Sequence, residues 1–215
     1  MPCNCCEITD SAFSESEAKS ELQRYRRKGP PEQTRLLLQA IRSLKLENAD
    51  LLDIGGGIGV IHHELLKDAA RSAVHVDASS AYLKEAKEEA VRQGHGERVT
   101  FHHADFTDIA PELPVADIVT LDRVVCCYPD FRRLLQAAAE HSQRALALTY
   151  PRETWYLRIA MPVMNFFQKI RRDPFRVFLH PVSEMDSLLR REGFERVFFR
   201  RLFVWEMALY QKTKL

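Results

Sequence analysis

Four glycines follow a carboxylate in the stretch LLDIGGGIGV at 51–60. Asp53 ends an apolar run typical of a buried strand, and Gly55, Gly57 and Gly59 follow at every second position. A glycine turn between a strand and a helix brings backbone N–H groups and a helix N-terminus to the carboxyl edge of a sheet, where open α/β folds bind ligands. The stretch therefore predicts a binding site for a small molecule.

The dinucleotide-binding pattern G-x-G-x-x-G does not fit, because Val60 stands where the third glycine would be. The pattern present is acid-x-G-x-G-x-G. A carboxylate beside the turn would repel a pyrophosphate, but it favours a ligand without phosphate that carries a positive amino group or sulfonium. S-adenosylmethionine has these properties.

From about Gln33 to Gln211 the sequence resembles the class I S-adenosylmethionine-dependent methyltransferases. The resemblance implies that Asp53 orients the methionine part of the cofactor. It also implies that Asp77, which ends VHVD 24 residues later, binds both ribose hydroxyls, and that Asp105 in HADF faces the adenine amino group. The predicted cofactor contacts are Asp53, Gly55, Gly56, Gly57, Gly59, Asp77, Ala78, Asp105, Phe106 and Leu121.

The acids also have purely structural interpretations. Asp77 is well placed to cap a helix that begins near Ser79, and Asp105 fits a turn. Asp122, after the fourth predicted strand, fits an ion pair with Arg123. The glycine run followed by acids at two successive strand ends favours the methyltransferase.

Methyl transfer from a sulfonium requires an aligned nucleophile and the exclusion of water, and a base only where the acceptor must lose a proton. The candidates for such a base are His180, Asp122 and Tyr150. The segment LDRVVCCYPD lacks the Asn-Pro-Pro-Tyr pattern of family members that methylate amino groups of DNA bases and glutamine. It is closer to the small-molecule branch, with a partial likeness to magnesium-protoporphyrin O-methyltransferases.

The cysteines and histidines raise the question of a metal. The cysteines form two groups, Cys3, Cys5 and Cys6 and then Cys126 and Cys127. If the N-terminal segment folds over the site, the thiols converge, and thiolates bind soft metals and metalloids such as arsenite. The alternative is a buried, inert pair after the fourth strand. We expect ordinary core histidines without a metal-ligating partner, and assign no metal ligand, at His62, His63, His102 and His103.

Short apolar runs alternate with amphipathic helices from Ala49 onward, which is typical of βαβ units and a parallel sheet. We expect strands near 50–54, 73–77, 98–102, 116–121 and 144–149, followed by an antiparallel pair at FERVFFRR and FVWEMALYQ. The predicted fold is α/β, a Rossmann-like seven-stranded and mostly parallel sheet with helices on both faces, an antiparallel last strand and an N-terminal helical cap.

The chain of 215 residues suits one sizeable domain. We expect an N-terminal helical cap segment at 1–45 and a methyltransferase domain at 46–215, with a cap-like insertion at 151–181. The insertion holds six basic and two acidic residues among aromatic side chains. This composition fits an apolar or aromatic acceptor that bears a carboxylate. One other interpretation is an amphipathic segment whose basic face is exposed to solvent and whose apolar face packs on the core. Another is peripheral contact with a membrane.

The overall balance of 31 basic and 30 acidic residues gives no field that would attract nucleic acid. The start, MPCNCCEITD, lacks the pattern of a secretory signal, so we expect a cytoplasmic protein. The predicted function is S-adenosylmethionine-dependent methyl transfer to a small molecule. The alternatives are methylation of a thiol-held metalloid and a non-catalytic module that binds the cofactor or activates a partner.

Overall fold

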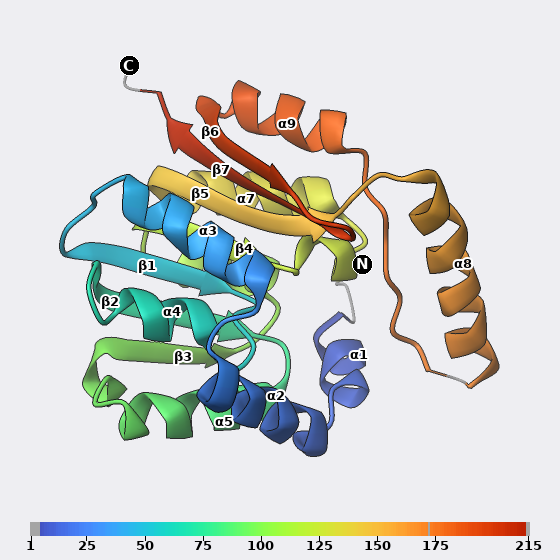
Figure 1. Cartoon of the computed structure of the whole chain (residues 1–215), viewed down its shortest axis with the longest axis horizontal. Helices are drawn as coiled ribbons and strands as arrows, with labels where there is room; N and C mark the ends of the chain where they lie inside the picture. Colours follow the sequence, from blue (N-terminus) through green and yellow to red (C-terminus); the bar gives the residue numbers. More distant parts are fainter. Residues whose placement is uncertain (1–4, 172, 214–215) are drawn as a thin grey trace.

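One mixed sheet organises the computed structural model, which describes residues 5–171 and 173–213 (Figure 1). The strand order is β3-β2-β1-β4-β5-β7-β6, in which β7 runs antiparallel to both neighbours and the first five strands are parallel. This confirms the predicted fold class. The strands are β1 (Ala49–Ile54), β2 (Ala70–Asp77), β3 (Val99–His103), β4 (Ala116–Asp122), β5 (Ser142–Pro151), β6 (Phe194–Arg201) and β7 (Trp205–Lys212).

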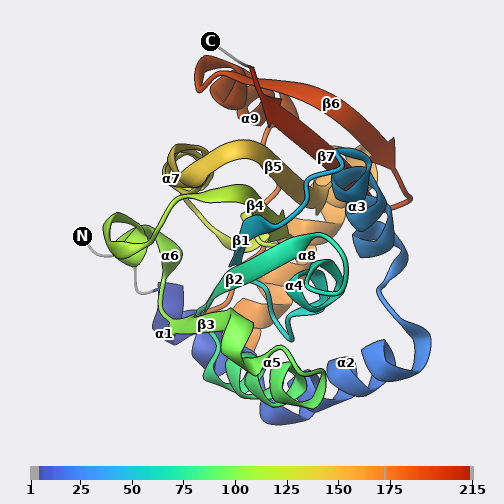
Figure 2. The same ribbon diagram turned by 90° about the vertical axis from the view of Figure 1, so that its left-hand side faces the viewer.

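Helices cover both faces of the sheet (Figure 2). One face packs against α3, α4 and α5, and the other against α6, α7 and α9, each around its own hydrophobic core. The helices are α1 (Cys5–Ala12), α2 (Glu15–Lys28), α3 (Glu32–Ser43), α4 (Val60–Leu65), α5 (Ser80–Arg92), α6 (Phe106–Ile109), α7 (Phe131–His141), α8 (Trp155–Ile170) and α9 (Val182–Arg191).

The three N-terminal helices, α1, α2 and α3, lie at different places relative to the sheet. A capping box between Ser14 and Glu17 begins α2, and Gly29, with φ of 72°, ends it. The apolar face of α3, which includes Leu37 and Ile41, is buried on β5 and β7. Thus α3 belongs to the core of the sheet, whereas α1 and α2 lie near its carboxyl edge. The division of the chain at residue 45 stays a prediction.

The segment after β5 departs from the alternating pattern. It forms α8, which stands away from the sheet beyond the carboxyl ends of the parallel strands, and an extended chain that returns to α9 (Figure 1). The sequence predicted a mostly helical insertion at 151–181, and the structure limits the helix to α8. Within the described ranges, no helix has both the length and the apolarity required to cross a membrane.

Candidate functional site

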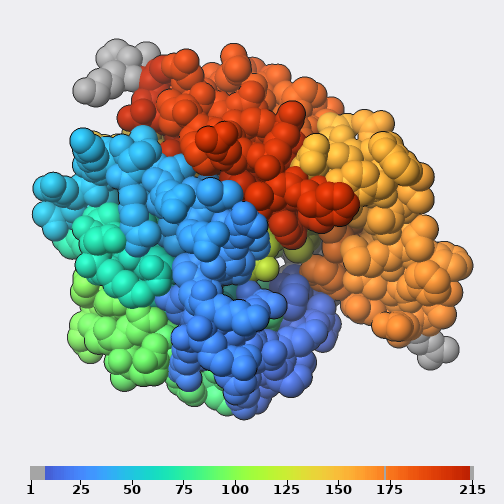
Figure 3. Space-filling model, viewed as in Figure 1, coloured from blue at the N-terminus to red at the C-terminus, as the bar shows by residue number. Residues whose placement is uncertain are grey.

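A cavity of about 550 Å³ lies at the carboxyl edge of the parallel strands. Its lining comes from the glycine turn after β1, the ends of β2, β3 and β4, and the helices α1, α2 and α8. Figure 3 shows the surface hollowed between the N-terminal helices, the β6–β7 turn and α8. The volume falls within the range of about 300–1,000 Å³ usual for small-molecule sites.

Two glycines of the turn have a left-handed backbone conformation that residues with a side chain rarely adopt. Gly55 has φ of +59°, and its N–H donates to the carbonyl of Val76 at 2.7 Å. A Cβ at Gly55 would lie 2.5 Å from Cγ2 of Val124. Gly57 has φ of +56°, and its N–H donates to Oδ2 of Asp77 at 2.8 Å. Both glycines line the cavity.

The other two glycines of the motif accommodate side chains behind the turn. A Cβ at Gly56 would lie 2.5 Å from Oδ2 of Asp53 and 2.7 Å from Nδ1 of His75. Gly59, with φ of +83°, precedes α4 and does not line the cavity. A Cβ there would lie 2.3 Å from the ring of His62. Gly59 therefore has a packing role outside the cavity lining, and its predicted cofactor contact stays a prediction.

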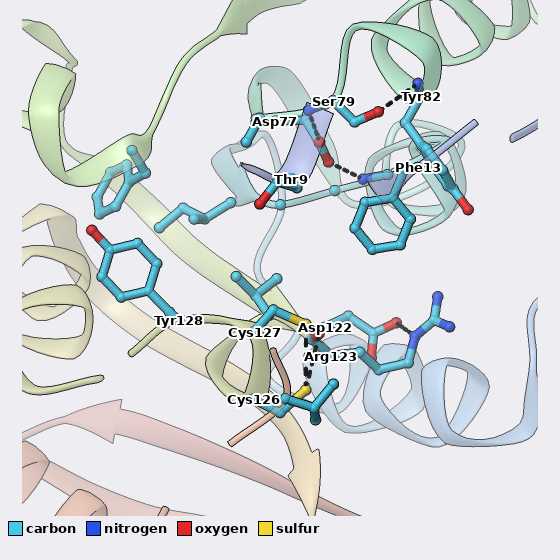
Figure 4. A pocket seen from close by; sticks show the side chains of 18 of the residues that line it. Thr9, Phe13, Asp77, Ser79, Tyr82, Asp122, Arg123, Cys126, Cys127 and Tyr128 are labelled. Carbon is cyan, nitrogen blue, oxygen red and sulfur yellow. Dashed lines mark hydrogen bonds and ion pairs between the residues drawn. The ribbon is translucent and has the colours of Figure 1, made fainter. Parts of the chain in front are cut away.

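Asp77 lies on the cavity wall that the glycine turn and the end of β2 form (Figure 4). Its carboxylate accepts the N–H groups of Gly57 and Ser79 at 2.8 and 2.7 Å. Burial raises the pKa of Asp77 to about 6, although the two hydrogen bonds oppose the shift. The helix cap itself is Ser79, whose hydroxyl accepts the N–H of Tyr82. Helix α5 is therefore capped by the side chain of Ser79, not by that of Asp77 as the structural alternative predicted.

Asp105 also performs a structural task at the cavity wall. It begins α6 by accepting the N–H of Thr107 at 2.9 Å, and the hydroxyl of Tyr128 donates to it at 3.1 Å. Phe106 and Ala78 line the cavity beside it. Leu121, in contrast, has no exposed surface and belongs to the hydrophobic core. Of the predicted cofactor contacts, the cavity lining therefore contains Ala78, Asp105 and Phe106 but not Leu121.

A strained, charged segment follows β4. Arg123 has φ of +67°, which costs a residue with a side chain about 1 kcal/mol or more. Its guanidinium pairs with Glu21 of α2 at 3.0 Å and lies 3.8 Å from Asp122. Oδ2 of Asp122 accepts the hydroxyl of Thr34 at 2.6 Å, while Oδ1 is buried without a partner in the described part of the chain. Asp122 and Arg123 both line the cavity.

The cysteines of the LDRVVCC segment lie at the same wall. Sγ of Cys126 is 3.7 Å from Sγ of Cys127, and both residues line the cavity (Figure 4). The hydrogen bond between the two thiols raises the pKa of Cys126 and lowers that of Cys127. Cys3 lies outside the described residues, as do the side chains of Cys5 and Cys6. The predicted convergence of five thiols stays a prediction.

Comparison with known proteins agrees with this geometry. Residues 51–145 match the family model of the methyltransferase domain. The chain contains a methyltransferase domain, and its fold is that of the class I methyltransferases. The match confirms the predicted family and enzyme class, with S-adenosylmethionine as the cofactor. None of the curated proteins matches the chain in sequence.

Several solved structures share the fold of this methyltransferase. Magnesium protoporphyrin IX methyltransferase from Synechocystis PCC 6803 with bound SAH has a TM-score of 0.69 at 17% identity, covering 97% of this chain and 100% of that one. A putative sarcosine dimethylglycine methyltransferase from Galdieria sulphuraria has a TM-score of 0.67 at 15% identity, with coverage of 84% and 85%. An O-methyltransferase family protein from Burkholderia thailandensis has a TM-score of 0.67 at 16% identity, with coverage of 94% and 61%.

Two of the three base candidates of the methyltransferase lie away from the cavity. Tyr150 is 2% exposed within the hydrophobic core, and burial raises the pKa of its hydroxyl strongly. His180 contacts the carbonyl of Tyr128 through Nε2 at 2.9 Å and stacks on Phe178, and burial lowers its pKa. Neither lines the cavity. Asp122 is the candidate that the structure brings there.

A buried histidine cluster behind the glycine turn is the feature that the sequence did not reveal. His62 of α4 and His75 of β2 contact each other and Asp53. Burial lowers the pKa of both imidazoles to about 3 and raises the pKa of Asp53. The expectation that His62 has no neighbouring group able to ligate a metal is wrong, because strand β2 brings His75 next to it.

The clash at Gly55 predicts a measurable loss of stability. Gly55→Ala adds left-handed strain of about 1–2 kcal/mol and an overpacking cost of about 1–3 kcal/mol against Val124. Gly94→Ala is the matched control, because Gly94 also has positive φ, +76°, but no atom within 4 Å of its Cβ position. Urea unfolding should show a larger loss for Gly55→Ala, partly recovered with Val124→Ala in a double-mutant cycle. Equal losses at both glycines would contradict the close approach to Val124.

Proposed function

We propose that this methyltransferase binds S-adenosylmethionine along the ends of β1, β2 and β3 and methylates an apolar or aromatic small molecule held on the α8 side of the same cavity. The observation that carries the proposal is the division of one cavity into a wall of acids at strand ends and a wall of apolar helix. Bound there, S-adenosylmethionine supplies a methyl group on a sulfonium that is already an activated leaving group.

The acid wall suits an adenosine. Asp77 holds its carboxylate still through two backbone N–H groups, and each of its oxygens can accept further hydrogen bonds from ribose hydroxyls. Asp105 is fixed in the same way by Thr107 and Tyr128 on the next strand end. Phe106 and Ala78 offer flat apolar surface beside these acids. The polar part and the ring of a nucleoside would thus meet groups of matching chemistry.

The opposite wall suits an apolar acceptor. Leu157, Met161 and Met164 of α8 line the cavity. Phe13, which follows α1, packs edge-on against Phe175, which follows α8, with ring centroids 5.2 Å apart. This contact joins the two segments over the cavity, so both help to exclude water from the reacting atoms.

The charged residues at the end of β4 lie between the two walls. Arg123 is the basic side chain of the described lining, so a carboxylate on the acceptor would be bound there. None of the described basic residues of the 151–181 insertion lines the cavity; Arg158, for example, pairs with Glu153. We propose Asp122 as the group that accepts a proton or hydrogen bond from the acceptor, because its Oδ1 is buried and unpartnered in the described structure.

The paired thiols support a second candidate substrate. Cys126 and Cys127 lie on the cavity wall with their sulfur atoms 3.7 Å apart. Two adjacent thiols can hold a soft metalloid such as arsenite. Arsenite is therefore included among the acceptors to be tested. A non-catalytic module would bind the cofactor and methylate none of them.

Cofactor binding should depend on pH through Asp77. Its carboxylate accepts ribose hydroxyls best when ionised, and its pKa is about 6. Affinity should therefore rise as pH increases through 6, by about tenfold between pH 5 and 7 if only the ionised form binds. Calorimetry with S-adenosylhomocysteine measures this, since the ligand's own amino and carboxyl groups, with pKa values of about 8 and 3.5, titrate outside most of that interval.

The control for this titration is a pair of isosteric variants. Asp77→Asn should bind weakly with a flat pH profile, whereas Asp68→Asn, at an exposed acid that pairs with Arg42, should retain the wild-type profile. A pH-dependent profile in Asp77→Asn would exclude Asp77 as the titrating ribose ligand.

The acceptor is tested by the formation of S-adenosylhomocysteine with a panel of aromatic carboxylic acids, uncharged aromatics and arsenite. Turnover is expected with an aromatic member. Asp122→Asn should still bind cofactor but lose at least about tenfold in kcat, as expected for a proton acceptor, and Asp77→Ala provides the blank. Cofactor binding without turnover on any member would favour the non-catalytic module, and turnover on arsenite alone would favour the second candidate.

We also propose that α8 contacts an anionic membrane surface. Its outer side leaves Trp155, Phe166 and Ile170 at least 60% exposed, and Arg158 and Lys169 lie on the same helix. An exposed apolar helix side with basic residues is the composition of interfacial helices. This contact would bring a lipophilic acceptor close to the α8 wall of the cavity.

Vesicle sedimentation tests the membrane contact. The wild-type protein should bind phosphatidylserine-containing vesicles more tightly than phosphatidylcholine vesicles, and salt should weaken the binding. Phe166→Ser with Phe167→Ser should weaken it by about tenfold or more. Val91→Ser is the control, because Val91 is an apolar residue on the distant helix α5 that is at least as exposed as the two phenylalanines. Equal binding of all three proteins would contradict the proposal.

A further inference from the structure

In the buried cluster behind the glycine turn, His62 and His75 have no part in methyl transfer as proposed above, whereas Asp53 also lines the cavity and is a predicted cofactor contact. His62 and His75 are 0% exposed, and Asp53 is 1% exposed. They come from three elements: Asp53 from β1, His75 from β2 and His62 from α4. Imidazole and carboxylate groups buried together are the ligand types that Zn²⁺ uses in proteins.

Three ligand atoms of this cluster converge. Nδ1 of His62 lies 3.1 Å from Oδ2 of Asp53 and 3.2 Å from Nδ1 of His75, and the latter lies 3.9 Å from the same carboxylate oxygen. Bonds of about 2.0–2.1 Å place the ligands of a tetrahedral Zn²⁺ about 3.3–3.4 Å apart. Two of the observed separations are slightly shorter than this value and the third is longer. An ion with bonds of about 2.1 Å to all three atoms would lie about 0.6 Å out of their plane, in a distorted site that is open to a fourth ligand.

Hydrogen bonds alone leave this arrangement incomplete. Nδ1 of His62 is within hydrogen-bonding distance of both Asp53 and His75. A neutral imidazole nitrogen either donates one hydrogen or accepts one. If Nδ1 of His62 donates to Asp53, it has no lone pair for His75. If it accepts from His75, it has no hydrogen to donate to the ionised carboxylate of Asp53. A cation would satisfy all three atoms at once.

Gly56 keeps the space beside these atoms open. An added Cβ there would lie 2.5 Å from Oδ2 of Asp53 and 2.7 Å from Nδ1 of His75. Both Gly56 and Asp53 also line the cavity, so the cluster is next to a route for a small ion. The absence of a side chain at position 56 therefore serves the cluster as much as the turn.

We propose that Asp53, His62 and His75 form a Zn²⁺ site that joins β1, β2 and α4 behind the cofactor turn. Oδ2 of Asp53 and Nδ1 of each histidine are the three protein ligands. Oδ1 of Asp53 stays bound to the hydroxyl of Thr120 at 2.6 Å, which orients the carboxylate. A fourth ligand is a water that enters from the cavity side. The ion stabilises the turn, and its binding does not require methyl transfer.

The first test uses the wild-type chain alone. After removal of metals with a chelator, the protein should take up one equivalent of Zn²⁺ in a titration followed by elemental analysis. The midpoint of thermal unfolding should rise by about 5–10 °C at a Zn²⁺ concentration 100-fold above Kd. Uptake below about 0.1 equivalent without a thermal shift would overturn the proposal.

Cobalt substitution separates this site from the thiols. Co²⁺ bound by two imidazoles and a carboxylate should show visible d–d bands without the near-ultraviolet charge-transfer band of thiolate ligands. Cys126→Ala with Cys127→Ala should keep the equivalent of Zn²⁺. A thiolate band, or loss of zinc in that variant, would place the ion at the cysteines and contradict the site.

Variants locate the site within the histidine cluster. His75→Phe and Gly56→Ala should each lose at least about tenfold in Zn²⁺ affinity. His63→Phe is the matched control, because His63 is equally buried on α4 but is not one of the three ligands. Retention of wild-type affinity by His75→Phe would overturn the assignment. If that variant does not fold, the wild-type stoichiometry and the cobalt spectrum still decide the outcome.

Discussion

The carboxylate of Asp77 accepts hydrogen bonds from two backbone N–H groups that belong to different loops. The shape of the cavity wall at the glycine turn depends on this bridge. Gly57 lies on the turn after β1, and Ser79 lies on the turn after β2. The bridge holds neighbouring strand ends together and keeps Gly57 in its left-handed conformation. The carboxylate that performs this task is itself buried, and its raised pKa reflects the desolvation.

The glycine turn after β1 also faces away from the cavity, and on that side the space left by missing side chains matters more than the backbone conformation. Towards the cavity, Gly55 and Gly57 provide backbone shape, whereas Gly56 and Gly59 make room for Asp53, His62 and His75 behind it. The glycine run is therefore shared between a ligand site and a packed polar cluster. A substitution at one glycine is expected to affect one side more than the other.

Much of this arrangement could be predicted, because strand ends in a parallel sheet share one edge and their order follows from hydrophobic patterns. This reasoning placed Asp77, Asp105 and Asp122 at the cavity. The prediction failed for residues whose place at the cavity depends on the direction of a side chain or on a contact between segments far apart in the sequence. Leu121 precedes a cavity residue but points into the core, since successive strand side chains alternate between faces. Tyr150 directly precedes the insertion and His180 lies near its end, yet both pack into apolar surroundings. The approach of His75 to Asp53 depends on the register between β1 and β2, which no local pattern encodes.

A crystal structure of the wild-type protein with S-adenosylhomocysteine tests the role of Asp77 most directly. The account predicts both ribose hydroxyls within hydrogen-bonding distance of the Asp77 carboxylate, with the bonds from Gly57 and Ser79 retained. A ligand bound elsewhere, or an Asp77 side chain turned away from the sugar, would contradict it.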